Sequence, residues 1–185
     1  MADGLFYVDT RAPHISADVA SVTLASTDKA LIPVANIPIL GSNYFSFIGK
    51  AMRVMLFGRI TTGTTPGNGT VDIYWGSGAD ANGTIIGSSA AFALTASQTN
   101  LTWWLELIIR CRALGASGSL LVSGQFNANN AVVASSVQPV MIPASAPAAT
   151  TVDLTASNVI SPQFKRSGST AETMQVHEVV YQALN

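Results

Sequence analysis

Hydrophobic and polar residues alternate with a period of two along residues 101–112. Leu101, Trp103, Leu105, Leu107, Ile109 and Cys111 share one apolar face, and Thr102, Trp104, Glu106, Ile108, Arg110 and Arg112 share the other. This alternation is typical of a β-strand that buries one face. A glycine-rich stretch at 115–118 separates it from a second alternating segment through Leu120, Val122 and Phe126. The pattern therefore predicts a long β-hairpin.

Shorter segments with strand-like composition occur along the rest of the chain, separated by Gly, Pro, Asn and Ser. We expect them at 19–24, 30–32, 51–60, 70–75, 84–86, 91–94, 137–142, 150–154, 158–164 and 172–184. In the last of these, Met174, Val176 and Val180 are predicted to share the buried face. In 70–75, Val71, Ile73 and Trp75 should point inward, and Asp72 and Tyr74 outward. No window keeps a helical period. The fold class predicted is all-β: a single two-sheet antiparallel sandwich, jelly-roll in type.

The chain of 185 residues suits one domain of sandwich size. Residues 1–18 are predicted to form an extended N-terminal arm, and residues 19–185 the sandwich. The arm carries a short apolar patch, Leu5, Phe6, Tyr7 and Val8, separated from the first domain strand by Arg11 and Pro13. Such a patch can add a strand to a neighbouring chain or to its own sheet. We expect contact with a neighbour, and the pattern leaves both arrangements open.

Charged residues make up only 10% of the chain, against about 25% in typical soluble domains. A surface so poor in charge suits a subunit covered by neighbours, although a Ser/Thr-rich extracellular domain has the same composition. Nine basic and ten acidic residues are spread without a basic stripe, so no nucleic-acid partner is expected. Prolines interrupt the longest apolar stretch, 31–40, so no membrane span is expected.

The residues that carry most enzyme chemistry are few and scattered. Cys111 lies on the apolar face of its strand and is predicted to be a buried hydrophobe. The two histidines, His14 and His177, are far apart in the sequence, and no metal-ligand cluster is visible. Glu106 and Glu172 would form a paired-carboxylate site only if the fold brought them together. The sequence therefore predicts no catalytic, metal or cofactor site, no cofactor, and a protein that is not an enzyme.

One aromatic residue in the long strand is out of phase with the core. Trp75 and Trp103 fall on the apolar faces of their strands, whereas Trp104 shares its face with Arg110 and Arg112. Tryptophan is enriched at buried interfaces. Trp104, Arg110 and Arg112 are therefore predicted to lie at an interface, where another subunit or the edge of the second sheet covers Trp104. A ligand platform for sugars is the alternative.

Several runs of residues together resemble a known class of proteins. The runs are 44–59 (YFSFIGKAMRVMLFGR), 69–76 (GTVDIYWG), 101–112 with 115–119, and 124–126. In this order they resemble small β-sandwich virion proteins of tailed bacteriophages. The resemblance covers about residues 44–126 and implies a structural role in the particle.

This resemblance implies a capsid decoration protein that oligomerises on the phage head, as a trimer, and stabilises it. The partners would be the major capsid protein or other virion proteins, and the location would be the virion, after synthesis in the host cytoplasm. The alternative is a host-binding domain of a tail or head fibre. In that case loops at one end of the sandwich, such as Thr61–Gly69, would contact surface glycan.

Overall fold

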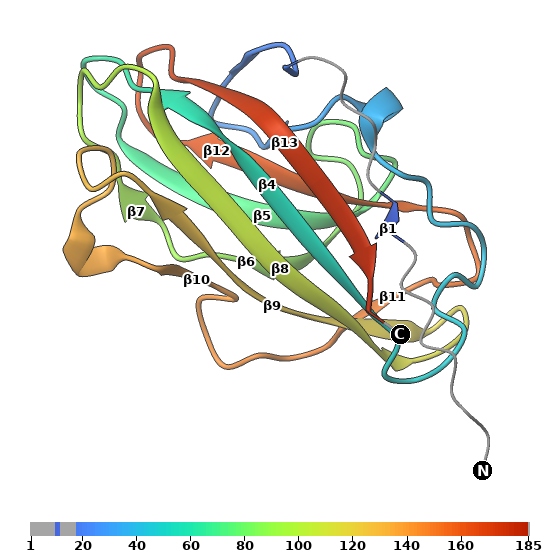
Figure 1. Cartoon of the computed structure of the whole chain (residues 1–185). Coiled ribbons are helices and arrows are strands. Elements are labelled where there is room, and N and C mark those ends of the chain that lie inside the picture. Colours follow the sequence, from blue (N-terminus) through green and yellow to red (C-terminus); the bar gives the residue numbers. More distant parts are fainter. Residues whose placement is uncertain (1–9, 12–17, 185) are drawn as a thin grey trace.

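The computed structural model describes residues 10, 11 and 18–184, and they form two antiparallel β-sheets packed face to face (Figure 1). In the large sheet the strand order is β1-β13-β4-β8-β9-β10, with β11 paired to β9 and β2 to β13. In the small sheet the order is β3-β12-β5-β6, with β7 paired to β5. The predicted all-β, two-sheet antiparallel sandwich is confirmed.

The strands agree closely with the segments expected from the alternating pattern. The large sheet contains β1 (Thr10–Arg11), β2 (Val22–Thr23), β4 (Ala51–Thr61), β8 (Leu101–Ala113), β9 (Gly118–Ala128), β10 (Val140–Ile142), β11 (Thr150–Val152) and β13 (Thr173–Ala183). The small sheet contains β3 (Lys29–Ala30), β5 (Asn68–Gly76), β6 (Thr84–Ser88), β7 (Phe92–Ala93) and β12 (Val159–Arg166). Two short 3-10 turns, η1 (Val34–Asn36) and η2 (Ser135–Val137), lie in the connections. No helix in the described part of the chain is long and apolar enough to cross a membrane.

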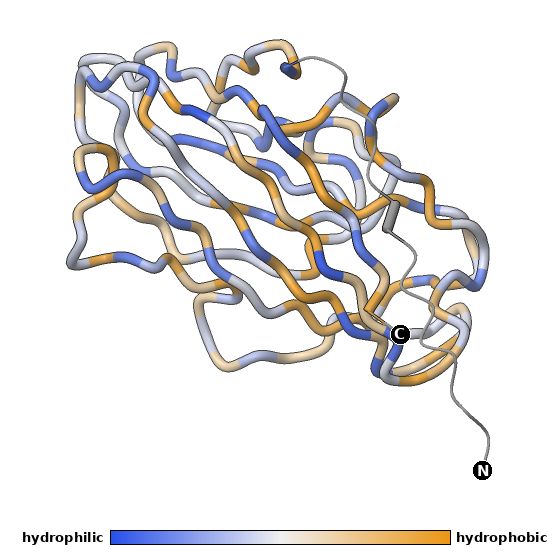
Figure 2. Tube along the Cα trace, in the orientation of Figure 1, coloured by the Kyte–Doolittle hydropathy of each residue, from blue (hydrophilic) through white to orange (hydrophobic). Residues whose placement is uncertain are grey.

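The core fills the space between the two sheets, and the hydropathy colours alternate along the long strands (Figure 2). The large sheet contributes the even positions of β4 and the odd positions of β8, among them Leu56, Trp103 and Leu107. The small sheet contributes Ile73 and Phe164. Cys111 is fully buried, as predicted, and burial raises the pKa of its thiol. Side chains with a period of two thus supply one continuous apolar layer.

Strand β13 departs from the predicted alternation at one point. A β-bulge between Val176 and Glu178 places two residues opposite one residue of β4. The phase of the strand therefore reverses after His177, and Val179 and Tyr181 are buried. The prediction that Val180 shares the buried face is wrong for this reason: Val180 is opposite Met55 on the outside of the sheet.

The described residues of the predicted arm contact the chain's own large sheet. Thr10 and Arg11 pair with Gln182 and Tyr181 of β13. His177 Nδ1 lies 2.7 Å from Asp18 Oδ1, a contact that is an ion pair when the imidazole is protonated. The apolar patch Leu5, Phe6, Tyr7 and Val8 lies outside the described residues, as does His14, so its contact with a neighbouring chain stays a prediction.

Candidate functional site

The outward-facing side of the large sheet carries several apolar side chains among polar ones. Its strands β13, β4, β8, β9 and β10 place seven partly or fully exposed apolar side chains on this side, which we call the outer face: Val180, Met55, Phe57, Trp104, Ile108, Leu121 and Met141. Met141 is 55% exposed, and Phe57 is 37% exposed. An apolar surface that spans several strands marks an interaction site more often than scattered single residues do.

The strand register sets the order of these residues across the sheet. Glu178, Phe57, Trp104 and Asn127 form one row, because each is the Cα partner of the next. Val180, Met55, Glu106, Gln125 and Met141 form the adjoining row on the same face. Side chains directly opposite on neighbouring strands contact one another. The outer face is therefore one connected surface.

Polar side chains, among them an ion pair near the centre, interrupt the apolar residues of the outer face. Arg53 contacts Glu106 through Nη2 at 2.5 Å and through Nε at 2.8 Å, and both side chains are about two-thirds buried. The two opposite charges neutralise each other in the middle of the face. An exposed pair of this type contributes about 0–1 kcal/mol to stability. Its main effect is to leave the centre of the outer face without net charge.

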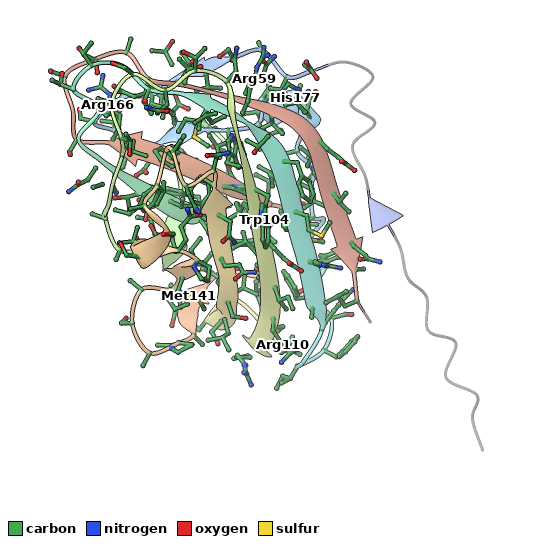
Figure 3. The ribbon with its side chains drawn as sticks, turned by 60° about the vertical axis from the view of Figure 1, so that its left-hand side comes forward. Arg59, Trp104, Arg110, Met141, Arg166 and His177 are labelled. Atoms are coloured by element: carbon green, nitrogen blue, oxygen red, sulfur yellow. The ribbon has the colours of Figure 1, made fainter. Side chains whose placement is uncertain are left out.

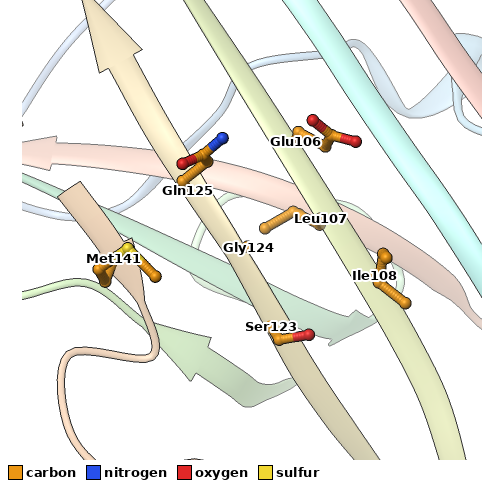
Figure 4. Close-up of a pocket in the computed structure, with 7 residues that line it drawn as sticks. All are labelled: Glu106, Leu107, Ile108, Ser123, Gly124, Gln125 and Met141. Carbon is orange, nitrogen blue, oxygen red and sulfur yellow. The ribbon is translucent and has the colours of Figure 1, made fainter. Parts of the chain in front are cut away.

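A shallow hollow of about 220 Å³ lies beside this ion pair (Figure 4). We call it the Met141 hollow; it is lined by Glu106, Leu107, Ile108, Ser123, Gly124, Gln125 and Met141. A second depression, of about 210 Å³, lies on the other side of Met141, against Phe92, Val137 and Pro139. Because Met141 borders both, the apolar surface continues around strand β10.

Trp104, Arg110 and Arg112, the predicted interface residues, all belong to this side of the sheet. Trp104 is partly buried near the middle, and Arg110 lies at one end, with His177 and Arg59 toward the opposite end (Figure 3). Arg110 and Arg112 are exposed. The structure therefore brings Trp104 together with Phe57 and Glu106, and it places the two arginines at the margin.

Glu106 and Glu172, the two carboxylates considered for catalysis, have separate partners. Glu106 pairs with Arg53 on the outer face. Glu172 is fully buried and pairs with Arg166, with 2.6 Å between Oε2 and Nε, and it also accepts a hydrogen bond from the Thr170 hydroxyl. Each carboxylate thus has an arginine of its own on a different pair of elements. Among the described residues no group of three or more His, Cys, Asp and Glu side chains is placed to hold a metal ion.

A third group of charges lies on the outside of the small sheet. Asp72 and Tyr74 point outward as predicted, yet both are buried. Asp72 pairs with Lys165 at 2.5 Å, and the Tyr74 hydroxyl donates to Asp28 at 2.8 Å. Lys165 also reaches Asp28, at 3.5 Å. Lys165 therefore pairs with two carboxylates, and these contacts attach the segment around Asp28 to the small sheet.

Burial raises the pKa of Asp28, and the nearby Asp72 raises it further, against the opposing effects of Tyr74 and Lys165. A carboxyl group with a raised pKa in the folded state is most stabilising when protonated, and that contribution is lost as pH rises through the folded pKa. We expect Asp28→Asn to increase the free energy of unfolding at pH 7. The increase should shrink as pH falls toward the ordinary pKa of 3.8. Urea unfolding at pH 7 and pH 4 measures both values, and an equal change at the two pH values would contradict burial of the charge as the cause.

Comparisons with known proteins find few similarities. No protein-family model matches the chain, and no curated protein matches it. Among solved structures, a legume lectin-like domain from Entamoeba histolytica aligns with a TM-score of 0.32 and 10% sequence identity. The alignment covers 94% of this chain and 88% of that one.

The likeness concerns the β-sandwich alone. At this TM-score and identity it carries no argument about what the present chain binds. The sandwich implied by the resemblance to phage virion proteins is confirmed by the structure itself. The virion part of that resemblance stays a prediction.

Proposed function

We propose that this chain is a non-enzymatic structural protein that assembles through the outer face of its large sheet. The exposed apolar surface around Phe57, Trp104 and Met141 carries the proposal. Burial of apolar surface contributes about 25 cal/mol per Å² before the cost of association is subtracted. A partner that covers these side chains would supply the main driving force.

A second copy of this chain is a partner that can place opposite charges together across the outer face, although Arg59 adds a cation near Glu178. Arg110 and Arg112 lie at one end of the outer face. Glu178 is opposite Phe57, which lies six residues along β4 from Ala51, the residue opposite Arg110. That separation is about 20 Å along the strand. In a two-fold, face-to-face pair, the basic end of each copy would meet Glu178 of the other. Arg59 lies beyond Glu178 and is hydrogen bonded to Gln175.

The resemblance to small β-sandwich virion proteins supports a virion as the location of this assembly. We propose a capsid decoration protein, whose partners are its own copies and the major capsid protein or another virion protein. The low charge of the chain supports the same role, because a subunit covered by neighbours needs few solvated side chains. The self-complementary face favours a pair as the elementary contact. The trimer stays a prediction.

Phe57→Lys is expected to weaken self-association strongly, because it places an unpaired cation in the middle of the apolar face. Light scattering coupled to gel filtration, over a range of concentrations, measures the effect. Ile39→Lys is the matched control, since Ile39 is 66% exposed in a loop away from the outer face. Equal association by wild type, Phe57→Lys and Ile39→Lys would contradict the proposal.

Glycan binding on the same face is a second candidate, favoured by the Met141 hollow. Glu106, Gln125 and Ser123 line this hollow, and Trp104 lies two positions from Glu106 on the same side of β8. An apolar ring beside hydrogen-bonding groups is the usual composition of a small-ligand site. The loop Thr61–Gly69, the predicted glycan contact, is tied to the neighbouring segment 167–169, since Thr65 and Asn68 hydrogen bond to Ser169 and Ser167. Binding of the protein to bacterial cells, lost in Trp104→Ala, would favour this candidate.

A further inference from the structure

A small polar hollow lies beside the far end of β4, near Glu178 but separate from the apolar residues of the outer face. We call it the Arg59 hollow; Ser21, Arg59, Thr61, Asn100, Thr173 and Gln175 line it. Its volume is about 70 Å³. A water molecule takes about 30 Å³ in the liquid, so the hollow has room for one group of about two or three heavy atoms. None of the described residues that line it is acidic.

The guanidinium of Arg59 is held in place by its neighbours. Arg59 Nε donates to Gln175 Oε1 at 2.8 Å, and Gln175 Nε2 donates to the carbonyl of Val19 at 2.9 Å. The amide of Gln175 is thereby fixed with its oxygen toward Arg59. Among the described residues, the two terminal nitrogens of Arg59 have no acceptor. Arginine presents these nitrogens as a planar fork that matches a carboxylate.

On the opposite side of the hollow, Thr61 and Asn100 hydrogen bond to each other. The backbone N–H of Asn100 donates to Thr61 Oγ1 at 3.1 Å, and the Thr61 hydroxyl reaches Asn100 Oδ1 at 3.5 Å. Asn100 adopts a left-handed backbone with φ of 52°, which asparagine tolerates better than most residues. The amide nitrogen of Asn100 and the hydroxyls of Ser21 and Thr173 remain as hydrogen-bond donors. The hollow therefore presents one cation and several donors, and two of its acceptors, Gln175 Oε1 and Thr61 Oγ1, already accept hydrogen bonds.

We propose that the Arg59 hollow binds a single carboxylate group, held by the terminal nitrogens of Arg59 and the side-chain amide of Asn100. Binding at this site does not require the assembly through the outer face, although Arg59 lies two residues from Phe57 on the same side of β4. A carboxylate can come from an acidic sugar or from an aspartate or glutamate of another protein. Both sources share the chemistry that Arg59 recognises.

Titration with sodium acetate, followed by amide NMR shifts of the full chain at constant ionic strength, tests the site directly. We expect saturable shifts at Thr61, Asn100 and Thr173. Arg59→Gln should weaken acetate binding at least tenfold, and Asn100→Asp, which keeps a residue tolerant of the left-handed backbone, should weaken it similarly by repulsion. Lys29→Gln removes one positive charge from the small sheet, where Lys29 pairs with the exposed Asp80, and should change binding less than twofold.

Two further ligands distinguish the sources. Glucuronate, with glucose as its neutral control, represents an acidic sugar, and N-acetyl-aspartate N-methylamide, with the asparagine analogue as control, represents a protein side chain. Tighter binding of one than of acetate identifies the source. Shifts that stay linear with concentration, equal binding of the neutral controls, or equal losses in Arg59→Gln and Lys29→Gln would overturn the proposal.

Discussion

Glu172→Ala is expected to lower the free energy of unfolding by about 3–5 kcal/mol, because it leaves a buried arginine without its partner. Glu172 is fully buried, and the Arg166 side chain is only 14% exposed. The charge of Arg166 would stay in a low-dielectric site, with little water and no carboxylate to compensate it. Urea unfolding monitored by tryptophan fluorescence measures the loss.

The exposed ion pair of the outer face provides the matched control. Glu106→Ala removes the partner of Arg53, whose side chain is 38% exposed and can be solvated. We expect a cost of about 1 kcal/mol or less. The double variant Glu172→Ala/Arg166→Met should recover much of the stability lost in Glu172→Ala, since no charge is then buried. A loss in Glu172→Ala no greater than that in Glu106→Ala would refute the stabilising role of the buried pair.

Gly58→Ala is expected to cost about 3 kcal/mol, since it overpacks the junction of β4 and β13. A Cβ at Gly58 would lie 2.0 Å from the carbonyl oxygen of Gln175 and 2.8 Å from Cζ2 of Trp103. The first contact is with backbone, so strand β13 would have to move. Gly58 also lies opposite Trp103, so the missing side chain leaves room for the indole ring.

Gly41→Ala is the control for the glycine substitution. Among the described residues, no atom lies within 4 Å of a Cβ built at Gly41. Alanine there should leave stability unchanged or raise it by about 0.4–1 kcal/mol, because it restricts the unfolded chain. Thermal melts of the two variants give the comparison. Equal melting temperatures for Gly58→Ala and Gly41→Ala would show that the sheet accommodates the added methyl group.

The strands were predictable because one face of each long strand is buried. In β8, every second residue from Trp103 to Cys111 is nearly or completely buried, and this burial is what the alternation of the sequence reflects. Short strands such as β3, with two residues, carry too little pattern to fix their bounds. Alternation indicates a strand only when enough of its residues face the core. The long strands were therefore predictable, and the bounds of the short strands were not.

Two features could not be predicted from local pattern. The bulge at His177 adds one residue to β13, and alternation read without the partner strand cannot locate it. The burial of Asp72 depends on Lys165 and Asp28, which are distant in the sequence and meet only through the pairing of β5 with β12 and the segment around Asp28. The alternation predicted only that Asp72 and Tyr74 point outward, and tertiary contacts cover both side chains.

The candidate site was found in part. The position of Trp104, out of phase with the core, correctly indicated an outward-facing surface on β8. The neighbouring residues Phe57 and Met141 come from strands whose register with β8 and β9 is set only by the complete sheet. The sequence of β4 did contain a signal for this surface, because Met55 and Phe57 are apolar residues at outward-facing positions. The Arg59 hollow had no sequence signal, because it joins four separate segments.

The face-to-face pairing is tested most directly by exchanging the charges at the two ends of the outer face. Wild type should associate with itself, and Arg110→Glu and Glu178→Arg should each weaken that association by about tenfold or more, because like charges meet twice in a two-fold contact. The double variant Arg110→Glu/Glu178→Arg should associate as wild type does. Sedimentation equilibrium of the four proteins at low salt gives the dissociation constants. A wild type that stays monomeric at high concentration, or charge reversals that leave its association unchanged, would contradict assembly through this face.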